Sequence, residues 1–123
     1  MDAFRSDLQS LRKERAGSFP AFDHAVKDPE PGAVRVEPGT PLVVVEGLYV
    51  LLCDWQVEPL FDLRVFIDCD TDLAMQRIAR RHLETGIAAT MEASRLRVET
   101  SDYPNARLIL ADGCRERADL VLA

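Results

Sequence analysis

The chain has 123 residues, of which 47% are hydrophobic, and a formal net charge of −6. This length fits a single domain, and the acidic balance argues against binding to nucleic acid or to anionic membranes, because both rely on basic surfaces. The apolar runs are too short to span a membrane, and the charged N-terminal segment has no apolar stretch like that of a secretory signal. We therefore expect a cytoplasmic protein without nucleic-acid or membrane partners, with the nucleus and import into an organelle left open.

The first third of the chain predicts a helix followed by a loop. Apolar residues at helical spacing indicate a helix over residues 2–15, which should stop near Gly17. Residues 16–41 contain five prolines and three glycines, so we expect a loop that holds at most a short strand at 33–36.

Two apolar segments further along predict strands of a parallel sheet. Residues 42–45 read Leu-Val-Val-Val, and residues 63–67 form a second such run, closed by Asp68. Continuous apolar runs are typical of strands that are buried on both faces. Between the two strands, a short helix could open at residues 49–53.

The C-terminal half predicts helices followed by a last strand. Thr71 is a plausible N-cap for a helix that runs to about residue 85, and Gly86 suits the position after the helix end. A second helix is expected over residues 91–110, with Pro104 as a candidate interruption. The final residues, ADLVLA, indicate a third strand.

Strands that alternate with helices predict an α/β fold with a parallel sheet. In such sheets ligands bind beyond the carboxyl ends of the strands, and Glu46, Gly47 and Asp68 occupy these ends. The alternative for Glu46 is a carboxylate that turns to solvent where its strand stops, with Gly47 supplying a turn. This segment alone does not separate the two interpretations.

The cysteines and histidines do not predict a metal centre. Cys53, Cys69 and Cys114 are far apart in the sequence, without a C-x-x-C pair, and His24 and His82 are isolated from them. This spacing does not match a zinc site and favours reduced cysteines in the core.

Three segments together resemble the phosphoribulokinase/uridine kinase family of P-loop kinases. They are VVVEGLYVLL, RVFIDCDTDLAMQRIARRHLETGIAA and FDHAVKDP. The resemblance runs from about Phe19 to the C-terminus, and it is nearest to a branch of fungal P-loop kinases and bacterial proteins named as sugar, pantothenate or nucleoside kinases. It implies an incomplete three-layer α/β/α P-loop NTPase fold of the nucleoside- and NMP-kinase type. It also implies ATP and Mg²⁺ as cofactors of the complete enzyme.

The resemblance assigns roles to the Glu-Gly pair and to an arginine cluster. It implies that Glu46 acts near Mg²⁺ through a water molecule and that Gly47 lets the chain pass close to the nucleotide phosphates. Arg77 and Arg80 match the first two arginines of the family's lid, which stabilise the transferring phosphoryl group and contact the nucleotide.

The lid pattern departs from the family further along the same helix. Arg81 stands where the family has an aspartate, and Thr85 stands where it has its last arginine. Arg81 or His82 could take over that last phosphate contact. The alternative for the whole cluster is a solvated helix face.

The family also holds its phosphate acceptor with a segment that FPAFDHAVKDP resembles. The resemblance implies that Phe22, Asp23 and His24 bind the substrate, with Lys27 as a further candidate. An aromatic ring, a carboxylate and an imidazole suit a polar small molecule. The alternative is a proline-rich surface loop.

The Walker A loop of such kinases, G-x-x-x-x-G-K-[ST], is not in this sequence, which has no Gly-Lys pair. We therefore interpret residues 1–123 as the C-terminal portion of one P-loop kinase domain. Residues 1–18 would form the helix before the acceptor loop, and residues 19–123 would form the core and lid. In the family, the strand that feeds the Walker A loop lies between the VVVE and VFID strands, so both would lack a neighbour here.

Two functions follow from this interpretation. The first is an ATP-dependent kinase that phosphorylates a small-molecule hydroxyl, as in a nucleoside, a sugar or pantothenate, and that is present as a fragment inactive alone. It would need the missing P-loop half as a partner. The second is a non-catalytic binding or subunit-interaction module derived from a P-loop kinase.

Overall fold

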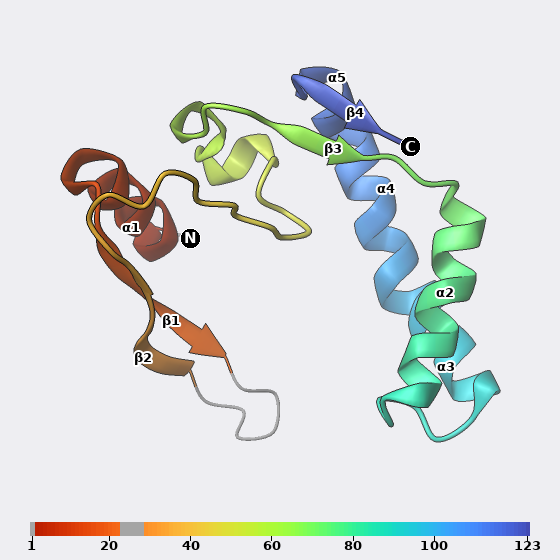
Figure 1. Cartoon of the computed structure of the whole chain (residues 1–123). Helices are drawn as coiled ribbons and strands as arrows, with labels where there is room; N and C mark the ends of the chain where they lie inside the picture. Colours follow the sequence, from red (N-terminus) through yellow and green to blue (C-terminus); the bar gives the residue numbers. More distant parts are fainter. Residues whose placement is uncertain (1, 23–28) are drawn as a thin grey trace. The chain divides into compact units, whose positions relative to one another are not determined.

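The structure is a computed structural model that describes residues 2–22 and 29–123. It contains two compact units, Met1–Asp62 and Leu63–Ala123, which are described one at a time (Figure 1). Within the described ranges, no helix combines the length and the apolar content that crossing a membrane requires.

The first unit begins with a helix and an antiparallel hairpin. Helix α1 (Asp2–Glu14) confirms the predicted N-terminal helix and buries Leu8. Strand β1 (Gly17–Phe22) pairs antiparallel with strand β2 (Pro29–Val36). The prediction of a loop over residues 16–41 was therefore wrong, although β2 does contain the short strand expected at 33–36.

The loop was predicted because the segment is rich in proline, which has no N–H group to donate to a strand ladder. A two-stranded hairpin has only edge strands, where proline is tolerated. The register runs from Gly17 opposite Val36 to Phe22 opposite Pro29. It shifts between Phe19 and Ala21, so the irregularity falls at Pro20, where a donor is missing anyway.

The predicted strand at residues 42–45 does not form a ladder. Residues 41–46 are not paired with any strand of the described chain. The exposed fraction of the residue surface is 75% for Leu42 and 79% for Val44. The short helix expected at 49–53 is also absent at that position. The chain instead makes a turn and then two 3₁₀ segments, η1 (Cys53–Trp55) and η2 (Glu58–Leu60).

The second unit contains the parallel sheet. Strand β3 (Val65–Ile67) pairs parallel with β4 (Leu120–Leu122), in the register Val65 to Leu120 and Ile67 to Leu122. Both strands confirm the predictions, with shorter bounds. The parallel direction requires a helical crossover between them, which the intervening residues supply.

Helix α2 (Thr71–Glu84) follows β3, as predicted. Its N-cap is Asp70 and not Thr71, because the Asp70 carboxylate accepts a hydrogen bond from the Leu73 N–H at 2.9 Å. After the C-cap Thr85, Gly86 has a φ of 73°, a left-handed conformation that glycine adopts without strain.

The second predicted helix is divided into three segments. They are α3 (Met91–Arg97), a π-helical turn η3 (Val98–Asp102) and α4 (Tyr103–Ala111). Pro104 lies in the first turn of α4, where its missing N–H costs little, and the irregular turn comes just before it. A short helix, α5 (Cys114–Arg117), then leads into β4.

The helices of the second unit share a core. Met75, Ala79 and Val98 are buried together, and Tyr103 and Ala106 pack against them, so α2, η3 and α4 lie side by side (Figure 1). The cysteine prediction was right only for Cys114, which is buried, because Cys53 and Cys69 are exposed. The described structure contains no disulfide.

Candidate functional site

Glu46 and Gly47 lie where the extended segment of the first unit turns. Glu46 is exposed and, within the described residues, forms no hydrogen bond or ion pair. A β-carbon added to Gly47 would lie 2.9 Å from the Val50 Cγ1, which is closer than such carbons approach one another. A side chain at position 47 would therefore force Val50 to move. The Glu46 carboxylate, which has no partner among the described residues, can meet a cation or water.

Aromatic and aliphatic side chains fix the chain after this turn. The Trp55 ring contacts Phe4 of α1 edge-on, at a centroid distance of 5.9 Å, and Tyr49 at 6.0 Å. Val57 is fully buried and Leu52 nearly so. These contacts pack residues 49–57 against α1. The residues that follow the Glu46–Gly47 turn are therefore held in place by side-chain packing.

The carboxylates at the end of β3 are already engaged. Asp68 accepts a hydrogen bond from the Arg115 Nε at 3.0 Å, and its backbone N–H donates to the Leu122 carbonyl at 2.6 Å. Asp70 caps α2. Both aspartates therefore help to hold the sheet and the helix start, whereas Glu46 has no such structural role.

The arginines of α2 share one exposed face. Met75, Ala79 and His82 form the buried stripe of this helix. Arg77, Arg80 and Arg81 project from the opposite side, since each residue advances by 100° around the axis.

No carboxylate in the described part of the chain pairs with these three guanidinium groups. The one side-chain contact is weak, from the Arg77 Nη1 to the Cys69 Sγ at 4.0 Å. The result is a concentrated positive face that is free to bind an anion such as a phosphate.

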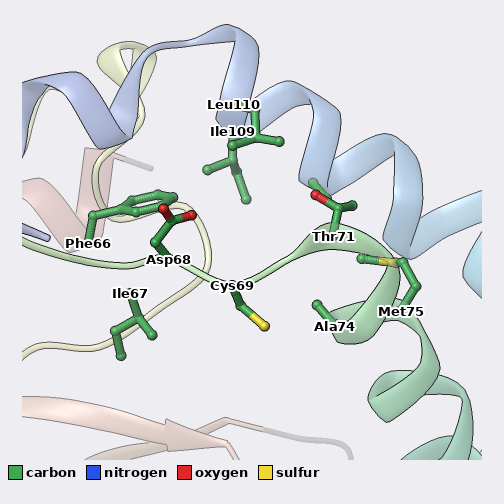
Figure 2. A pocket seen from close by; sticks show the side chains of 10 residues that line it. Phe66, Ile67, Asp68, Cys69, Thr71, Ala74, Met75, Ile109 and Leu110 are labelled. Atoms are coloured by element: carbon green, nitrogen blue, oxygen red, sulfur yellow. The ribbon is translucent and has the colours of Figure 1, made fainter. Parts of the chain in front are cut away.

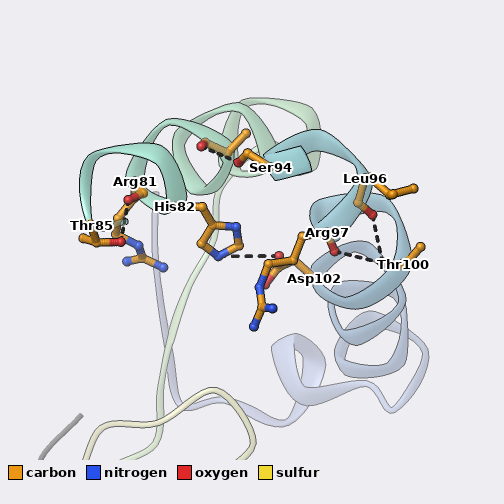
Figure 3. A network of polar contacts seen from close by, with 9 residues as sticks. Arg81, His82, Thr85, Ser94, Leu96, Arg97, Thr100 and Asp102 are labelled. Carbon is orange, nitrogen blue, oxygen red and sulfur yellow. Dashed lines mark hydrogen bonds and ion pairs between the residues drawn. The ribbon is translucent and has the colours of Figure 1, made fainter. Parts of the chain in front are cut away.

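His82 does not belong to this face. It is only 6% exposed, and its Nε2 lies 3.8 Å from an Asp102 carboxylate oxygen in η3 (Figure 3). Of the two residues that the sequence offered for the last phosphate contact, His82 is buried and Arg81 is exposed. The sequence does not predict this pair, because His82 and Asp102 are far apart along the chain and no motif marks Asp102.

A small pocket lies between β3, α2 and α4 (Figure 2). Its volume is about 150 Å³, and it is lined by side chains that are mostly apolar, among them Ile67, Met75 and Ile109, with Asp68 and Thr71 at its polar side. The pocket is too small for a nucleotide by itself, since ligand sites usually exceed about 300 Å³.

The structure does not test every predicted residue. Asp23, His24 and Lys27 lie outside the described residues, and of Phe22 only its place at the end of β1 is described. Glu46 and Gly47 belong to the first unit and the arginines to the second, each described on its own. Among the described residues, no three His, Cys, Asp or Glu side chains form a metal-binding cluster.

Comparison with known proteins identifies the family. The family model "Phosphoribulokinase / Uridine kinase family" matches residues 1–106. The ATP-dependent kinase YFH7 of Lachancea thermotolerans is 41% identical over 110 residues, which cover 83% of this chain and 31% of that protein.

Two solved structures are similar. One is the crystal structure of a protein from Silicibacter sp. TM1040 named as a fructose transport system kinase, with a TM-score of 0.87, 26% identity and coverage of 99% of this chain and 59% of that chain. The other is YFH7 of Saccharomyces cerevisiae, named as a P-loop containing kinase with a circular permutation. Its TM-score is 0.67 and its identity 31%, over 85% of this chain and 34% of that chain.

The chain thus spans about a third of the length of the YFH7 proteins that it matches. Both similar structures are kinases by name, and the yeast one is named as a P-loop containing kinase. The second unit has the parallel strands and the helices of such a fold. The expected fold class, an incomplete α/β P-loop fold, is confirmed. The chain belongs to the phosphoribulokinase/uridine kinase family.

Proposed function

We propose that this chain is the lid-bearing portion of an ATP-dependent kinase that phosphorylates a hydroxyl group of a small molecule, such as a nucleoside, a sugar or pantothenate. The unpaired arginine face of α2 is the observation that carries the proposal. During phosphoryl transfer, negative charge spreads over the oxygens of the transferring group, and planar guanidinium groups match those oxygens. Arg77, Arg80 and Arg81 would supply that stabilisation, with Arg77 and Arg80 also contacting the nucleotide.

Glu46 suits a magnesium site because a hard cation prefers oxygen ligands and keeps several of its waters. Its exposed carboxylate has no partner in the described structure, so it would hold a magnesium-bound water. When bound, Mg²⁺ would offset the charge of the nucleotide phosphates. Gly47, where a side chain does not fit, would keep the adjacent backbone open to those phosphates.

The acceptor would bind at the segment that joins β1 and β2. Phe22, Asp23, His24 and Lys27 bring an aromatic ring, a carboxylate, an imidazole and an ammonium group to this connection. Such groups recognise a polar small molecule by stacking and hydrogen bonding. The remaining acceptor contacts would come from a P-loop half, either in a longer chain or in a partner.

Calorimetric titration tests the need for that half. The 123-residue chain should show no saturation with ATP and Mg²⁺ at micromolar nucleotide, because the backbone cradle for the phosphates is not in this sequence. A polypeptide carrying a Gly-x-x-x-x-Gly-Lys loop should then be added, and ADP release measured with nucleosides, sugars and pantothenate. Turnover with none of these acceptors would contradict the proposed substrate class, and saturation by the chain alone would contradict the assigned site.

A second function is favoured by one observation. Residues 41–46 expose apolar side chains without a strand partner, a feature typical of an interaction surface. A non-catalytic subunit derived from a kinase would use this segment to bind a partner. It would form a stable complex in size-exclusion chromatography without ATP turnover, and the DNA upstream of Met1 would encode no Walker A loop.

A further inference from the structure

We propose that β3 is a docking surface for a second copy of this chain. The free edges of two β3 strands would pair antiparallel about Phe66 and join the sheets of two copies into one continuous sheet. This pairing uses residues of the second unit alone and does not depend on any catalytic activity. Its consequence for the kinase, given below, rests on the proposed function.

One edge of β3 has no partner strand in the described part of the chain, where β3 and β4 form a sheet of two strands. The bonds to β4 use alternate residues of β3. The Asp68 N–H donates to the Leu122 carbonyl at 2.6 Å, and the Arg64 carbonyl also accepts from β4. Successive residues of a strand point their N–H and C=O groups to opposite edges, so those of Val65 and Ile67 face away from β4. Each of these two residues therefore offers one donor and one acceptor at the free edge.

The free edge of β3 has neither lysine nor proline, the residues that often prevent the addition of a further strand. The strand reads Val-Phe-Ile, and Ile67 is 75% exposed and Val65 38% exposed. Figure 2 shows Ile67 on the opposite side of the chain from Phe66, which points toward α4. A strand that arrives at this edge would therefore find both backbone hydrogen-bonding groups and apolar side chains.

The sequence around β3 is complementary to itself when two copies run antiparallel. Residues 64–68 read Arg-Val-Phe-Ile-Asp. A two-fold axis at Phe66 places Val65 opposite Ile67 of the second copy, as a pair that exchanges two backbone hydrogen bonds. The same axis places Arg64 opposite Asp68 of the second copy, as a more closely spaced pair of opposite charges. By symmetry each pair occurs twice, so the charge pattern favours a second copy as the partner.

Charge and packing also select the direction and the register. Two β3 strands that paired parallel and in register would place like charges side by side, which is unfavourable. A shift of two residues in the antiparallel pair would place Phe66 opposite Arg64 or Asp68 instead of opposite the second Phe66.

The two charged residues already belong to ion pairs within one copy. Arg64 contacts Asp119 at 2.7 Å, and Asp68 contacts Arg115 at 3.0 Å. Pairing across copies would connect these pairs into networks of alternating charge. Exposed ion pairs contribute to stability mainly when they form such networks.

The same edge would serve the proposed kinase. In the family, the strand that feeds the Walker A loop lies beside the VFID strand, so a P-loop half and a second copy would compete for β3. Self-association would therefore keep chains without a P-loop half in a form that cannot assemble the active site. Addition of the half would separate the two copies.

Analytical ultracentrifugation of the 123-residue chain over a concentration series tests the dimer. The wild-type chain should show a reversible equilibrium between monomer and dimer. Ile67→Pro removes an N–H that faces the free edge and leaves the bonds to β4 in place. It should raise the Kd of the dimer at least about 10-fold, since each copy loses one donor of the ladder.

Ile67→Thr is the matched control, because it keeps the N–H and a β-branched side chain and should retain the dimer. Circular dichroism would show that both variants fold. A wild-type chain that stays monomeric up to its solubility limit would overturn the proposal. A dimer that is as tight in Ile67→Pro as in the wild type would also overturn it.

Disulfide trapping tests the register without a disruptive substitution. Val65→Cys and Ile67→Cys would each be made in a chain without the two exposed cysteines (Cys53→Ser, Cys69→Ser). Opposite positions of the proposed pair have Cα atoms about 5.5 Å apart, within disulfide range, whereas like positions are about 7–8 Å apart. A mixture of the two variants should therefore form a covalent dimer on mild oxidation, and either variant alone should not. Equal trapping in the single variants would overturn the antiparallel pairing.

A polypeptide with the P-loop half supplies the separate test of the consequence. Its addition should abolish trapping in the mixture, because it would occupy the same edge of β3. A half that neither binds nor restores turnover would contradict the proposed function, and the trapping pattern without the half would still decide the dimer.

Discussion

Two apolar segments of similar composition behave differently in this molecule. Residues 42–45 read Leu-Val-Val-Val and form no ladder, and the first three of them are exposed. Residues 65–67 read Val-Phe-Ile and form β3, paired in parallel with β4. Their intrinsic preference for extended backbone is alike. The difference is that only β3 finds a partner strand within the described chain.

An apolar segment therefore becomes a β-strand only where a second strand is available to pair with it. Extended backbone exposes N–H and C=O groups along its edges, and these need partners once they are buried. The second unit provides them through the β3–β4 ladder, and Arg64 and Asp119 reinforce the start of this ladder with hydrogen bonds of 2.7–2.9 Å. Residues 42–45 of the first unit are paired with no strand in the described part of the chain.

The carboxylates that follow the two segments differ in the same way. Asp68 ends β3 and is held by Arg115, whereas Glu46 ends the unpaired segment without a partner. A carboxylate that stabilises its own fold is a poor candidate for ligand binding. Glu46 is therefore the better candidate of the two for binding a ligand.

The largest expected effect concerns the ladder itself. Adding a polypeptide with the P-loop half should slow the exchange of amides 42–45 by about 10³-fold. The reason is that local opening of a paired central strand costs several kcal/mol of free energy. Amides 66 and 68 should already be protected in the isolated chain by β4. Mass-spectrometric exchange with and without the added half measures both. Equal protection of the two segments before addition would show that residues 42–45 already have a strand partner in the isolated chain.

Loss of the lid arginines should have the next largest effect. In the reconstituted kinase, Arg77→Ala and Arg80→Ala should each lower kcat by about 10²–10³-fold, the range for removing a donor to developing charge. KM should change less, because that charge is greatest in the transition state. Arg95→Ala, an exposed arginine of α3, is the matched control. An unchanged kcat in both variants would favour a solvated helix face.

Glu46→Gln should have a smaller effect, because the carboxylate would act on Mg²⁺ through water. Loss of such an outer contact costs about 10–100-fold in activity, while association of the two halves should stay intact. Steady-state kinetics at varied Mg²⁺ checks the first point and size-exclusion chromatography the second. Glu37→Gln, an exposed glutamate of the same unit, should leave turnover unchanged. Full activity of Glu46→Gln would make Glu46 a solvent-facing residue only.

The smallest effect concerns the Arg64–Asp119 clamp of β3. Hydrogen bonds from Arg64 lower the pKa of Asp119 from 3.8 to about 2. Because the folded pKa is depressed, the stabilisation is present above about pH 3.8 and is lost as the pH falls toward 2. Asp119→Asn should therefore lower the Tm slightly at neutral pH. The Tm of this variant should also fall less steeply than that of the wild type as the pH drops from about 3.8 to 2.

Thermal unfolding followed by circular dichroism over this pH range measures the effect. The shift should be small because the clamp is solvent-accessible and water screens it. Glu99→Gln provides the comparison, since its carboxylate is exposed and has no such clamp. A Tm that declines with acid as steeply in Asp119→Asn as in the wild type would show that the clamp contributes nothing to β3.

The sequence predicted well those elements that depend on local interactions. Helices α1 and α2 follow from apolar spacing, the end of α2 follows from Gly86, and the break before α4 follows from Pro104. Each of these signals acts within about one or two turns of the chain. The arginine face of α2 follows from the same periodicity, so this part of the candidate site was predictable.

Elements that depend on distant partners were not predictable in this way. The β1–β2 hairpin was missed because its prolines suggested a loop, and only the pairing shows that they occupy edge strands. The strand at 42–45 was expected from propensity, but within the described residues this segment pairs with no other strand. His82 stood out as a possible phosphate contact, and only the packing of η3 on α2 shows that it faces Asp102.

By itself, then, the sequence determined helices α1 and α2, strands β3 and β4, the family and the cluster of charges on α2. Tertiary structure alone decided which carboxylate stays free, which histidine is buried and which apolar segment becomes a strand. The reason is physical: local preferences act over a few bonds, whereas burial, ion pairs and ladders depend on groups that only the folded chain brings together.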